Sequence, residues 1–304
     1  MKLLQNRIAE GSLTLPAAMA FGAAAWLFCG LFSENLWPQI ACFAGTVYIL
    51  IELSNTNALL RIRSRMVSAT FIVLSCASCF LFKSFAGCVV QLCFVSAFYF
   101  LFHAYQDSLS MGRIYYAFVC IGLASLFCVE TLYYVPILWL LMAVQLQCLG
   151  MRTWLSSLLG LLTPYWFGLL WLVYIQDFSP LFVHFSQLFD LKLPVYDFSI
   201  QQTCSFIFIL LLCFVGIGHF LRFSFEDKIR IRFLLGFFSV LAVLSFLLAA
   251  LQPHLYMVFI PVAILCSSPL VAHLFTFTSS RLSNILFFIA LTVAVALTVL
   301  NIII

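Results

Sequence analysis

Long apolar segments follow one another along almost the whole chain, separated only by short polar stretches. Each is about 17 to 23 residues long, which as a helix is enough to cross a hydrocarbon core of roughly 30 Å. Only 8% of the residues are charged, against roughly 25% in soluble domains, so the chain cannot cover a water-facing surface. The pattern predicts an all-α fold, a polytopic transmembrane helical bundle.

The segments are apolar on all sides and lack the alternation of a membrane β-strand, which excludes a β-barrel. About eleven spans are expected from their length: residues 13–32, 36–53, 66–82, 85–103, 112–128, 131–149, 153–175, 203–221, 233–251, 254–276 and 281–303. The count falls to about nine if one of the short hairpins, which turn at Lys83 and Glu130, is re-entrant. No soluble domain, linker or internal repeat interrupts the pattern, so residues 1–304 are expected to form a single integral membrane domain.

Basic residues fall mostly in alternate loops. With the N-terminus in the cytoplasm, the outer segments contain only Lys83 and Lys192, and the inner segments contain the other twelve of the 14 basic residues. This bias follows the positive-inside rule and predicts a multi-pass protein of the bacterial inner membrane, with its N-terminus inside and its C-terminus outside. The net charge of +4 reflects this topology, and nucleic acid is not expected as a partner.

The longest outer loop predicts an outer interfacial helix near residues 179–190. Ser179 followed by Pro180 is typical of a helix start. One face is apolar and the other polar, a pattern that favours the membrane interface over a crossing. Its faces are Leu181, Phe182, Phe185, Leu188 and Phe189 against His184, Ser186, Gln187 and Asp190. Such a helix either acts as a lid over a substrate groove or simply covers the outer end of the bundle.

Polar residues expected on the outer side are candidates for a site. Glu34 and Glu130 are the candidate catalytic residues, since a carboxylate can act as general base. The hairpin of Glu130 is short enough to place a charge below the headgroups, where it needs a partner. The candidate substrate-binding residues are Asp177, His184, Asp190 and His254. The alternative is that these groups are solvated residues at helix ends.

Two inner loops are rich in charge. Arg61, Arg63 and Arg65 lie two residues apart and are candidates for binding a lipid phosphate or anionic lipid, although anchoring of the topology explains them as well. Further along, Ser224 lies three residues before Asp227, and this spacing resembles a capping box at the start of the helix predicted over 233–251.

Several signatures are missing from the sequence. There is no Walker loop, glycine-rich dinucleotide fingerprint, H-E-x-x-H or G-x-S-x-G motif, so no cofactor and no metal site are predicted. No charged residue lies near the centre of a span, which weakens the case for an ion-coupled transporter. The interior polar residues are Gln91, Gln145, Gln147 and His219.

One stretch supports a resemblance. Residues 112–166 contain Arg113 before a hairpin, the run "GLASLF" from Gly122, then Arg152 and Trp154 leading into "GLLTPY" from Gly160. This combination resembles a family of uncharacterised polytopic inner-membrane proteins of Bacteroidota. The specific match covers about a fifth of the chain, and the residues "YAFV" at 116–119 stand where the family has an acidic residue. The resemblance implies a membrane topology and an envelope setting, and no reaction.

A weaker similarity, at the level of the fold, is to polyprenyl-phosphate-dependent glycosyltransferases of the GT-C architecture. Those enzymes also have short hairpins and an outer acidic residue after the first helix, a place that Glu34 occupies here. Their acidic motif is usually longer than "SENLW". The similarity implies a polyprenyl-phosphate-linked sugar as substrate.

The sequence therefore predicts an integral inner-membrane protein of unknown biochemical activity in envelope biogenesis, and leaves open whether it is an enzyme. Three alternatives remain: a GT-C-like transferase, a transporter or lipid flippase, and a non-enzymatic scaffold or accessory subunit. The expected partners are membrane lipids, with a polyprenyl-phosphate lipid and other membrane subunits as further possibilities.

Overall fold

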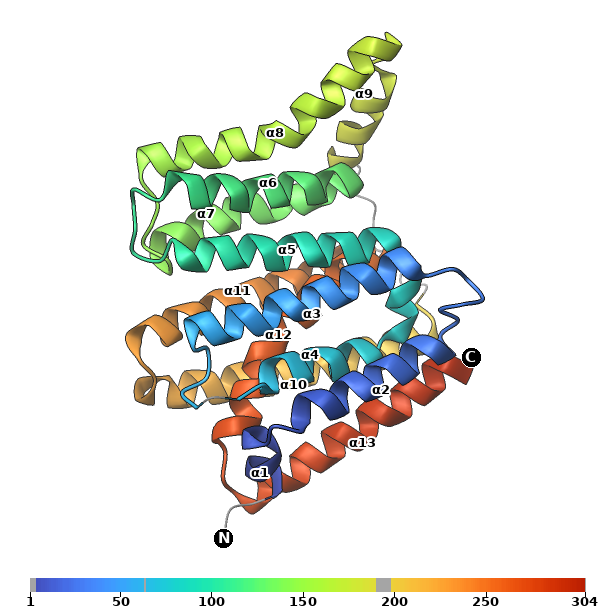
Figure 1. Ribbon diagram of the computed structural model, residues 1–304, viewed down its shortest axis with the longest axis vertical. Coiled ribbons are helices and arrows are strands. Elements are labelled where there is room, and N and C mark those ends of the chain that lie inside the picture. The colour runs from blue at the N-terminus through green and yellow to red at the C-terminus, as the bar shows by residue number, and fades with distance from the viewer. Residues whose placement is uncertain (1–3, 63, 190–197, 304) are drawn as a thin grey trace. The chain divides into compact units, whose positions relative to one another are not determined.

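The computed structural model describes residues 4–62, 64–189 and 198–303, and every regular element in these ranges is helical (Figure 1). The prediction of an all-α fold is confirmed. The chain divides into two compact units, one made of Met1–Cys88 and Val195–Ile304 and the other of Val89–Pro194.

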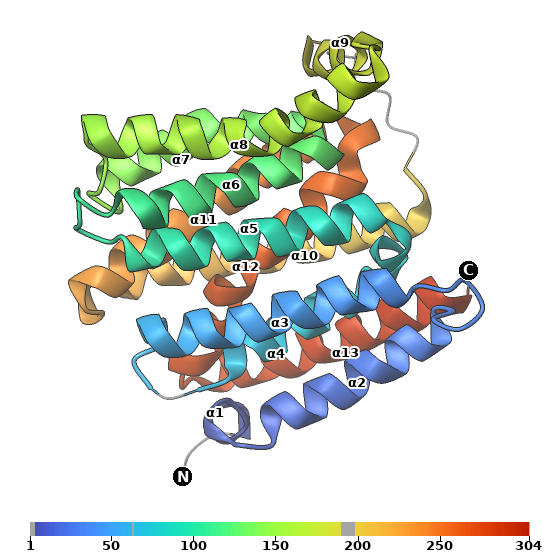
Figure 2. The ribbon, with the colours of Figure 1, turned by 45° about the horizontal axis from the view of Figure 1, so that its top comes forward.

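The first unit brings together the two ends of the chain. Its helices are α1 (Leu4–Glu10), α2 (Thr14–Phe28), α3 (Trp37–Asn57), α4 (Met66–Cys76), η1 (Cys79–Lys83), α10 (Ile200–Phe223), η4 (Ser224–Glu226), α11 (Ile229–Leu251), η5 (Pro253–Leu255), α12 (Tyr256–Phe277) and α13 (Arg281–Ile303). In both ribbon views α2, α4 and α13 lie side by side (Figures 1 and 2).

The second unit is formed by the middle of the chain. Its helices are α5 (Phe85–His103, from Val89 onward), α6 (Met111–Phe127), η2 (Val129–Tyr133), α7 (Tyr134–Val144), α8 (Met151–Ile175), α9 (Ser179–Ser186) and η3 (Gln187–Phe189). The predicted hairpin turns at Lys83 and Glu130 are 3-10 helices, η1 and η2.

Six of the described helices are long and apolar enough to cross a membrane, or seven if the bent pair α1 and α2 forms one span. The six are α5, α8, α10 continued by η4, α11, α12 preceded by η5, and α13. The helices α4 and α6 and the pair η2–α7 are apolar but shorter. The chain is therefore a multi-pass helical membrane protein.

Helix α12 is the core of the first unit. Its residues from Val258 to Thr276 are buried, since α1, α4, α10 and α11 pack around it. Its serine hydroxyls donate to backbone carbonyls one turn back, as Ser267 does to Ile264. On a neighbouring helix, Thr70 donates to the carbonyl of Ser268 at 3.0 Å. These hydroxyls are thereby paired inside protein, as the absence of water in a bilayer favours.

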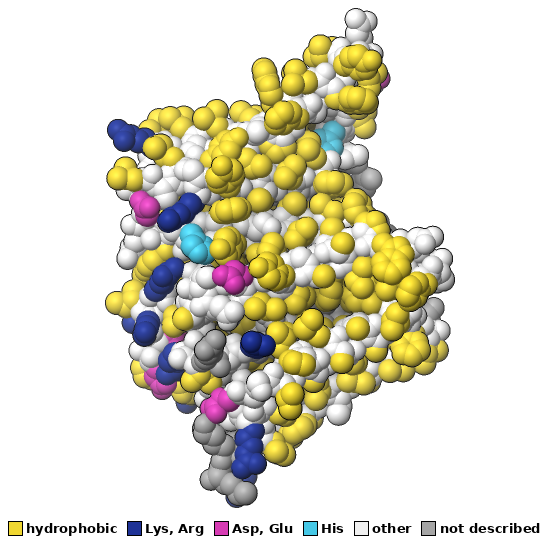
Figure 3. All heavy atoms as spheres, in the orientation of Figure 1, with side chains coloured by type: hydrophobic (Ala, Val, Ile, Leu, Met, Phe, Trp, Pro, Cys, Tyr) yellow, Lys and Arg dark blue, Asp and Glu magenta, His cyan; other side chains and the backbone are white. Residues whose placement is uncertain are grey.

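The flanks of the first unit are apolar. Figure 3 shows hydrophobic side chains spread over α2 and α3, with most of the visible charged side chains towards the left-hand side of the view. Examples are Met19, Trp37 and Tyr48, of which Tyr48 is 71% exposed. Large apolar side chains exposed in this way are expected where a helix faces lipid.

In the second unit, α6 and α8 approach each other closely through two glycines. A Cβ on Gly160 would lie 2.5 Å from the carbonyl oxygen of Tyr115, and one on Gly122 would lie 2.7 Å from that of Leu161. These glycines begin the runs "GLLTPY" and "GLASLF" that support the family resemblance. Small residues let membrane helices pack backbone to backbone, so the two runs have a structural explanation.

The same two runs hold α9 in place. Tyr165 donates from its hydroxyl to Ser125 Oγ at 2.8 Å, and its ring lies 5.2 Å from that of Phe185. His184 Nε2 lies 2.9 Å from the carbonyl oxygen of Ser125. The packed stripe of α9 thus includes His184, which the sequence pattern assigned to the polar face, while Phe182 from the expected apolar face is 75% exposed.

Candidate functional site

Polar side chains converge in the first unit, where α10 ends and α11 begins. Helix α10 stops at Phe223, η4 carries Ser224–Glu226, and the backbone at Asp227 is extended before α11 starts at Ile229. The Asp227 N–H donates to the carbonyl of Ser224 at 3.1 Å. This turn directs the Asp227 side chain into the unit rather than towards solvent, and its carboxylate is 0% exposed.

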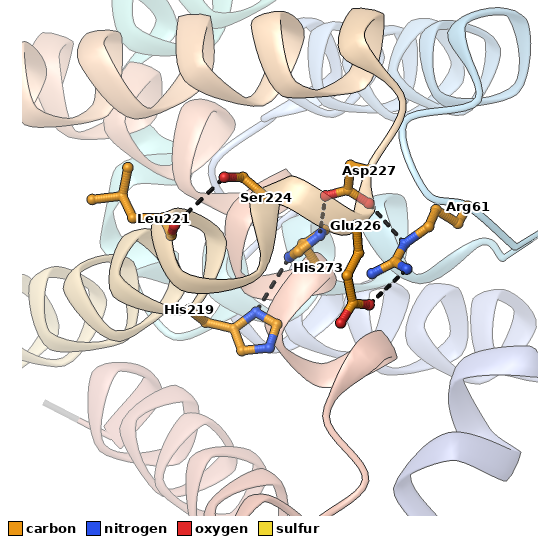
Figure 4. Close-up of polar contacts among 7 residues, drawn as sticks. All are labelled: Arg61, His219, Leu221, Ser224, Glu226, Asp227 and His273. Atoms are coloured by element: carbon orange, nitrogen blue, oxygen red, sulfur yellow. Dashed lines mark hydrogen bonds and ion pairs between the residues drawn. The ribbon is translucent and has the colours of Figure 1, made fainter.

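Asp227 is paired with two other residues (Figure 4). Its Oδ2 lies 3.0 Å from His273 Nε2, and its Oδ1 lies 2.7 Å from Arg61 Nε. The second contact lacks the angle of a hydrogen bond, and we treat it as an ion pair. Arg61 also donates to Glu226 Oε2 at 2.9 Å and stacks 4.4 Å from the ring centroid of Phe277. A buried carboxylate needs such partners to remain charged.

His273 extends this cluster to a second histidine. His273 belongs to the buried helix α12 and is fully enclosed, and its Nδ1 lies 3.3 Å from His219 Nδ1 on α10. The rings of Phe223 and Phe277 lie against His219 and His273, at 4.7 and 4.8 Å respectively. The resulting chain runs from Arg61 through Asp227 and His273 to His219, and we call it the relay.

The contacts determine where the protons lie in the relay. A carboxylate can only accept, so His273 Nε2 carries a proton. When both rings are neutral, His273 Nδ1 is therefore an acceptor, His219 Nδ1 donates to it, and the lone pair remains on His219 Nε2. A proton that reaches His219 Nε2 allows the Nδ1 proton to move to His273, where Asp227 stabilises the imidazolium.

One such proton would neutralise the net charge of the cluster. Arg61 supplies one positive charge and Asp227 and Glu226 supply two negative ones, so with neutral histidines these five side chains carry −1. One proton on the histidine pair brings the sum to zero. His219 is half-buried and Glu226 is 44% exposed, whereas His273 is fully buried, so His219 is the more accessible of the two histidines.

The predicted capping box is wrong. Ser224 donates to the carbonyl of Leu221 at 3.4 Å, and α11 begins after Lys228 without a side-chain cap. The ion pair with Arg61 and the hydrogen bond with His273 take the Asp227 carboxylate into the unit, where it cannot reach the amides of the first turn of α11.

The predicted catalytic carboxylates lie in different units. Glu34, in the first unit, has its Oε1 2.7 Å from Lys83 Nζ, and both side chains are about half exposed. Glu130, in η2 of the second unit, is 8% exposed. A catalytic role for either residue stays a prediction.

The predicted substrate-binding residues are also divided between the units. Asp177 lies just before α9, where it accepts hydrogen bonds from the Ser179 N–H and hydroxyl at 2.9 and 2.7 Å. These two hydrogen bonds, and chiefly the one from the hydroxyl, hold the pKa of Asp177 below its usual value. His184 is in α9 of the same unit, His254 is exposed in η5 of the first unit, and Asp190 lies outside the described residues.

Of the three candidate lipid-binding arginines, Arg61 belongs to the relay and Arg65 is exposed directly before α4. Arg63 lies outside the described residues. Arg61 was thus singled out in the sequence as a candidate for binding lipid phosphate, whereas in the structure it pairs with Asp227 and Glu226.

The relay was not apparent as a site in the sequence. His219 was noted only as an interior polar residue, and His273 was not noted at all. An ionisable residue inside a predicted membrane span is by itself a reason to look for a functional partner, and His273 in the span predicted over 254–276 meets that criterion.

Among the described residues, no three His, Cys, Asp or Glu side chains come together as ligands for a metal ion. The contacts of the relay themselves suit proton transfer between imidazoles and a carboxylate. No protein-family model, curated protein or solved structure matches the chain.

Proposed function

We propose that the chain is an enzyme of the bacterial inner membrane that transfers a group to or from a lipid-linked substrate during envelope biogenesis, with the relay as its general base. In this proposal the chain crosses the membrane about eleven times, with the N-terminus in the cytoplasm and the C-terminus outside. In this orientation the relay lies near the cytoplasmic face, because His219 and His273 are each four residues from the C-terminal ends of α10 and α12. Arg222 lies in the last turn of α10, and Arg281 follows α12 as the first residue of α13.

The contact between His219 and His273, with Asp227 behind it, carries the proposal. His219 Nε2 takes the proton of a substrate hydroxyl as its oxygen attacks the group to be transferred. The Nδ1 proton of His219 passes to His273, and the leaving group is protonated when this proton returns. A positioned base of this kind contributes about 10²- to 10⁴-fold to a rate, and a buried carboxylate that orients a histidine follows the logic of the serine protease triad.

The test compares two histidines in strains that lack the chromosomal gene. Envelope lipids and glycans are profiled by mass spectrometry after complementation with wild-type protein, with His219→Gln, or with His254→Gln as matched control. The species that disappears on deletion should return with wild type and His254→Gln and stay absent with His219→Gln at equal protein levels. Full restoration by His219→Gln would exclude the relay as the base, and loss with His254→Gln alone would favour the carboxylates and histidines predicted for the outer side.

A proton-coupled transporter or lipid flippase is the second candidate, because chains of acidic residues and histidines also carry protons in transporters. The relay supplies ionisable groups within two of the helices, near their ends and not at the centre of a span. In proteoliposomes a pH gradient should then drive movement of a fluorescent lipid, and His219→Gln should abolish that movement. A scaffold, in contrast, requires neither histidine and would be recovered with a stoichiometric partner.

A further inference from the structure

A pocket of about 340 Å³ lies inside the first unit, apart from the relay. Helices α2, α4, α10, α12 and α13 line it, with Ile8 contributed by α1. All of its walls belong to one compact unit.

The pocket offers nothing to a polar ligand. Thr14 and Thr70 are the only lining residues with hydroxyl groups, and both hydroxyls are used by the backbone. The Thr14 hydroxyl lies within hydrogen-bonding distance of the carbonyls of Ile8 and Gly11, and the Thr70 hydroxyl lies within that distance of the carbonyls of Met66, Val67 and Ser268. An apolar cavity of about 150 Å³ stays dry and binds benzene. A space more than twice as large, in a membrane protein, suits a hydrocarbon chain.

The depth of the pocket corresponds to one leaflet. Its lining runs from Met66 to Leu74 along α4 and from Phe287 to Val295 along α13. Eight residues of helix rise about 12 Å, close to half of the roughly 30 Å hydrocarbon core. The lining starts at the basic ends of these helices, because exposed Arg65 directly precedes α4 and exposed Arg281 begins α13.

We infer that this pocket binds one acyl chain of an anionic phospholipid from the leaflet at the basic ends of the helices. The chain fills the apolar space, and the headgroup lies at the level of Arg65 and Arg281, since each basic residue near the surface attracts anionic lipid by about 1 kcal/mol. A phospholipid acyl chain spans one leaflet, which is the depth available. The site does not depend on the proposed catalysis at the relay.

The test uses full-length protein in vesicles that contain a phosphatidylglycerol with a photoactivatable diazirine in its acyl chain. Cross-linked peptides are mapped by mass spectrometry. Ala290→Phe places a large side chain in the pocket from α13, and Ala296→Phe, on the exposed side of the same helix, is the matched control. Ala17→Phe places the same side chain in the pocket from an exposed position on α2. Its labelling tests the inference if Ala290→Phe does not fold.

Labelling of lining peptides in α4 and α13 should fall several-fold in the pocket variants and remain at the wild-type level in Ala296→Phe. A phosphatidylcholine probe with the same chain should label them more weakly. Unchanged labelling in both pocket variants would overturn the inference, and so would labelling by a photoactivatable polyprenyl phosphate but not by phosphatidylglycerol.

Discussion

The Nδ1 atoms of His219 and His273 lie 3.3 Å apart, so that one imidazole must donate a proton to the other. Because His273 also donates from Nε2 to Asp227, the state of His219 is fixed by a carboxylate that it does not touch. The proton position on the half-buried ring is thus set through the fully buried one. Two helices far apart in the sequence, α10 and α12, are thereby joined by one chain of hydrogen bonds.

Asp227→Asn should lower the stability of the protein by about 1–3 kcal/mol, the cost of leaving buried hydrogen-bonding partners unsatisfied. Arg61 would keep Glu226 as its ion-pair partner in the cluster, and His273 would lose its carboxylate. Thermal unfolding in detergent measures the change. Glu226→Gln is the matched control, since its side chain is 44% exposed and exposed ion pairs contribute about 0–1 kcal/mol. Equal losses in the two variants would contradict the assignment of Asp227 as the buried centre of the relay.

Glu34 and Lys83 should couple weakly. Their side chains are 44% and 56% exposed, and exposed ion pairs contribute about 0.2–1 kcal/mol, which salt reduces. A double-mutant cycle with Glu34→Gln and Lys83→Met, measured at low and high salt, should give a coupling energy in this range that disappears at high salt. A salt-independent coupling of several kcal/mol would instead indicate a desolvated pair.

Gly160→Ala should destabilise the second unit by about 1–3 kcal/mol, the usual cost of overpacking. The added methyl would lie 2.5 Å from the Tyr115 carbonyl oxygen and 3.1 Å from Phe118 Cβ, so α6 and α8 would have to separate. Gly168→Ala on the same helix is the matched control, because nothing lies within 4 Å of its Cβ position and alanine is the better helix former. Protease resistance of the two variants provides the comparison.

Ser179→Ala should raise the pKa of Asp177 towards its usual value, because the hydrogen bond from the Ser179 hydroxyl lowers this pKa more than the one from the Ser179 N–H does. A lowered pKa means that the charged carboxylate stabilises the start of α9 above about pH 4, the unfolded value, and that this contribution is lost as the pH falls through the lower, folded pKa. Carboxyl ¹³C NMR titration measures the shift. Ser186→Ala, at the other end of α9, should leave it unchanged.

Apolar length predicts much of this fold. Helices occupy the predicted segments because a chain this poor in charge has to satisfy its backbone internally in a membrane. The helix after Asp177 begins at Ser179, the residue that the Ser–Pro pair indicated. The glycines at 122 and 160 were visible as motif residues, but their packing role required the partner helix to be seen.

The site could not be predicted to the same extent, because its residues come from three separate parts of the sequence. Arg61, His219, Asp227 and His273 have no fixed spacing, and the turn at η4 decides that Asp227 points inward instead of capping α11. The spacing of Ser224 and Asp227 favoured a cap, because a local pattern contains no information about the buried His273, which lies 46 residues further on. Long-range pairing overrode a local pattern.

The central claim concerns proton positions, and ¹⁵N NMR of histidine-labelled protein in lipid bilayers measures them directly, with assignments from His219→Gln and His273→Gln. At alkaline pH, His219 should carry its proton on Nδ1 and His273 on Nε2. If both neutral rings carry their protons on Nε2, there is no relay.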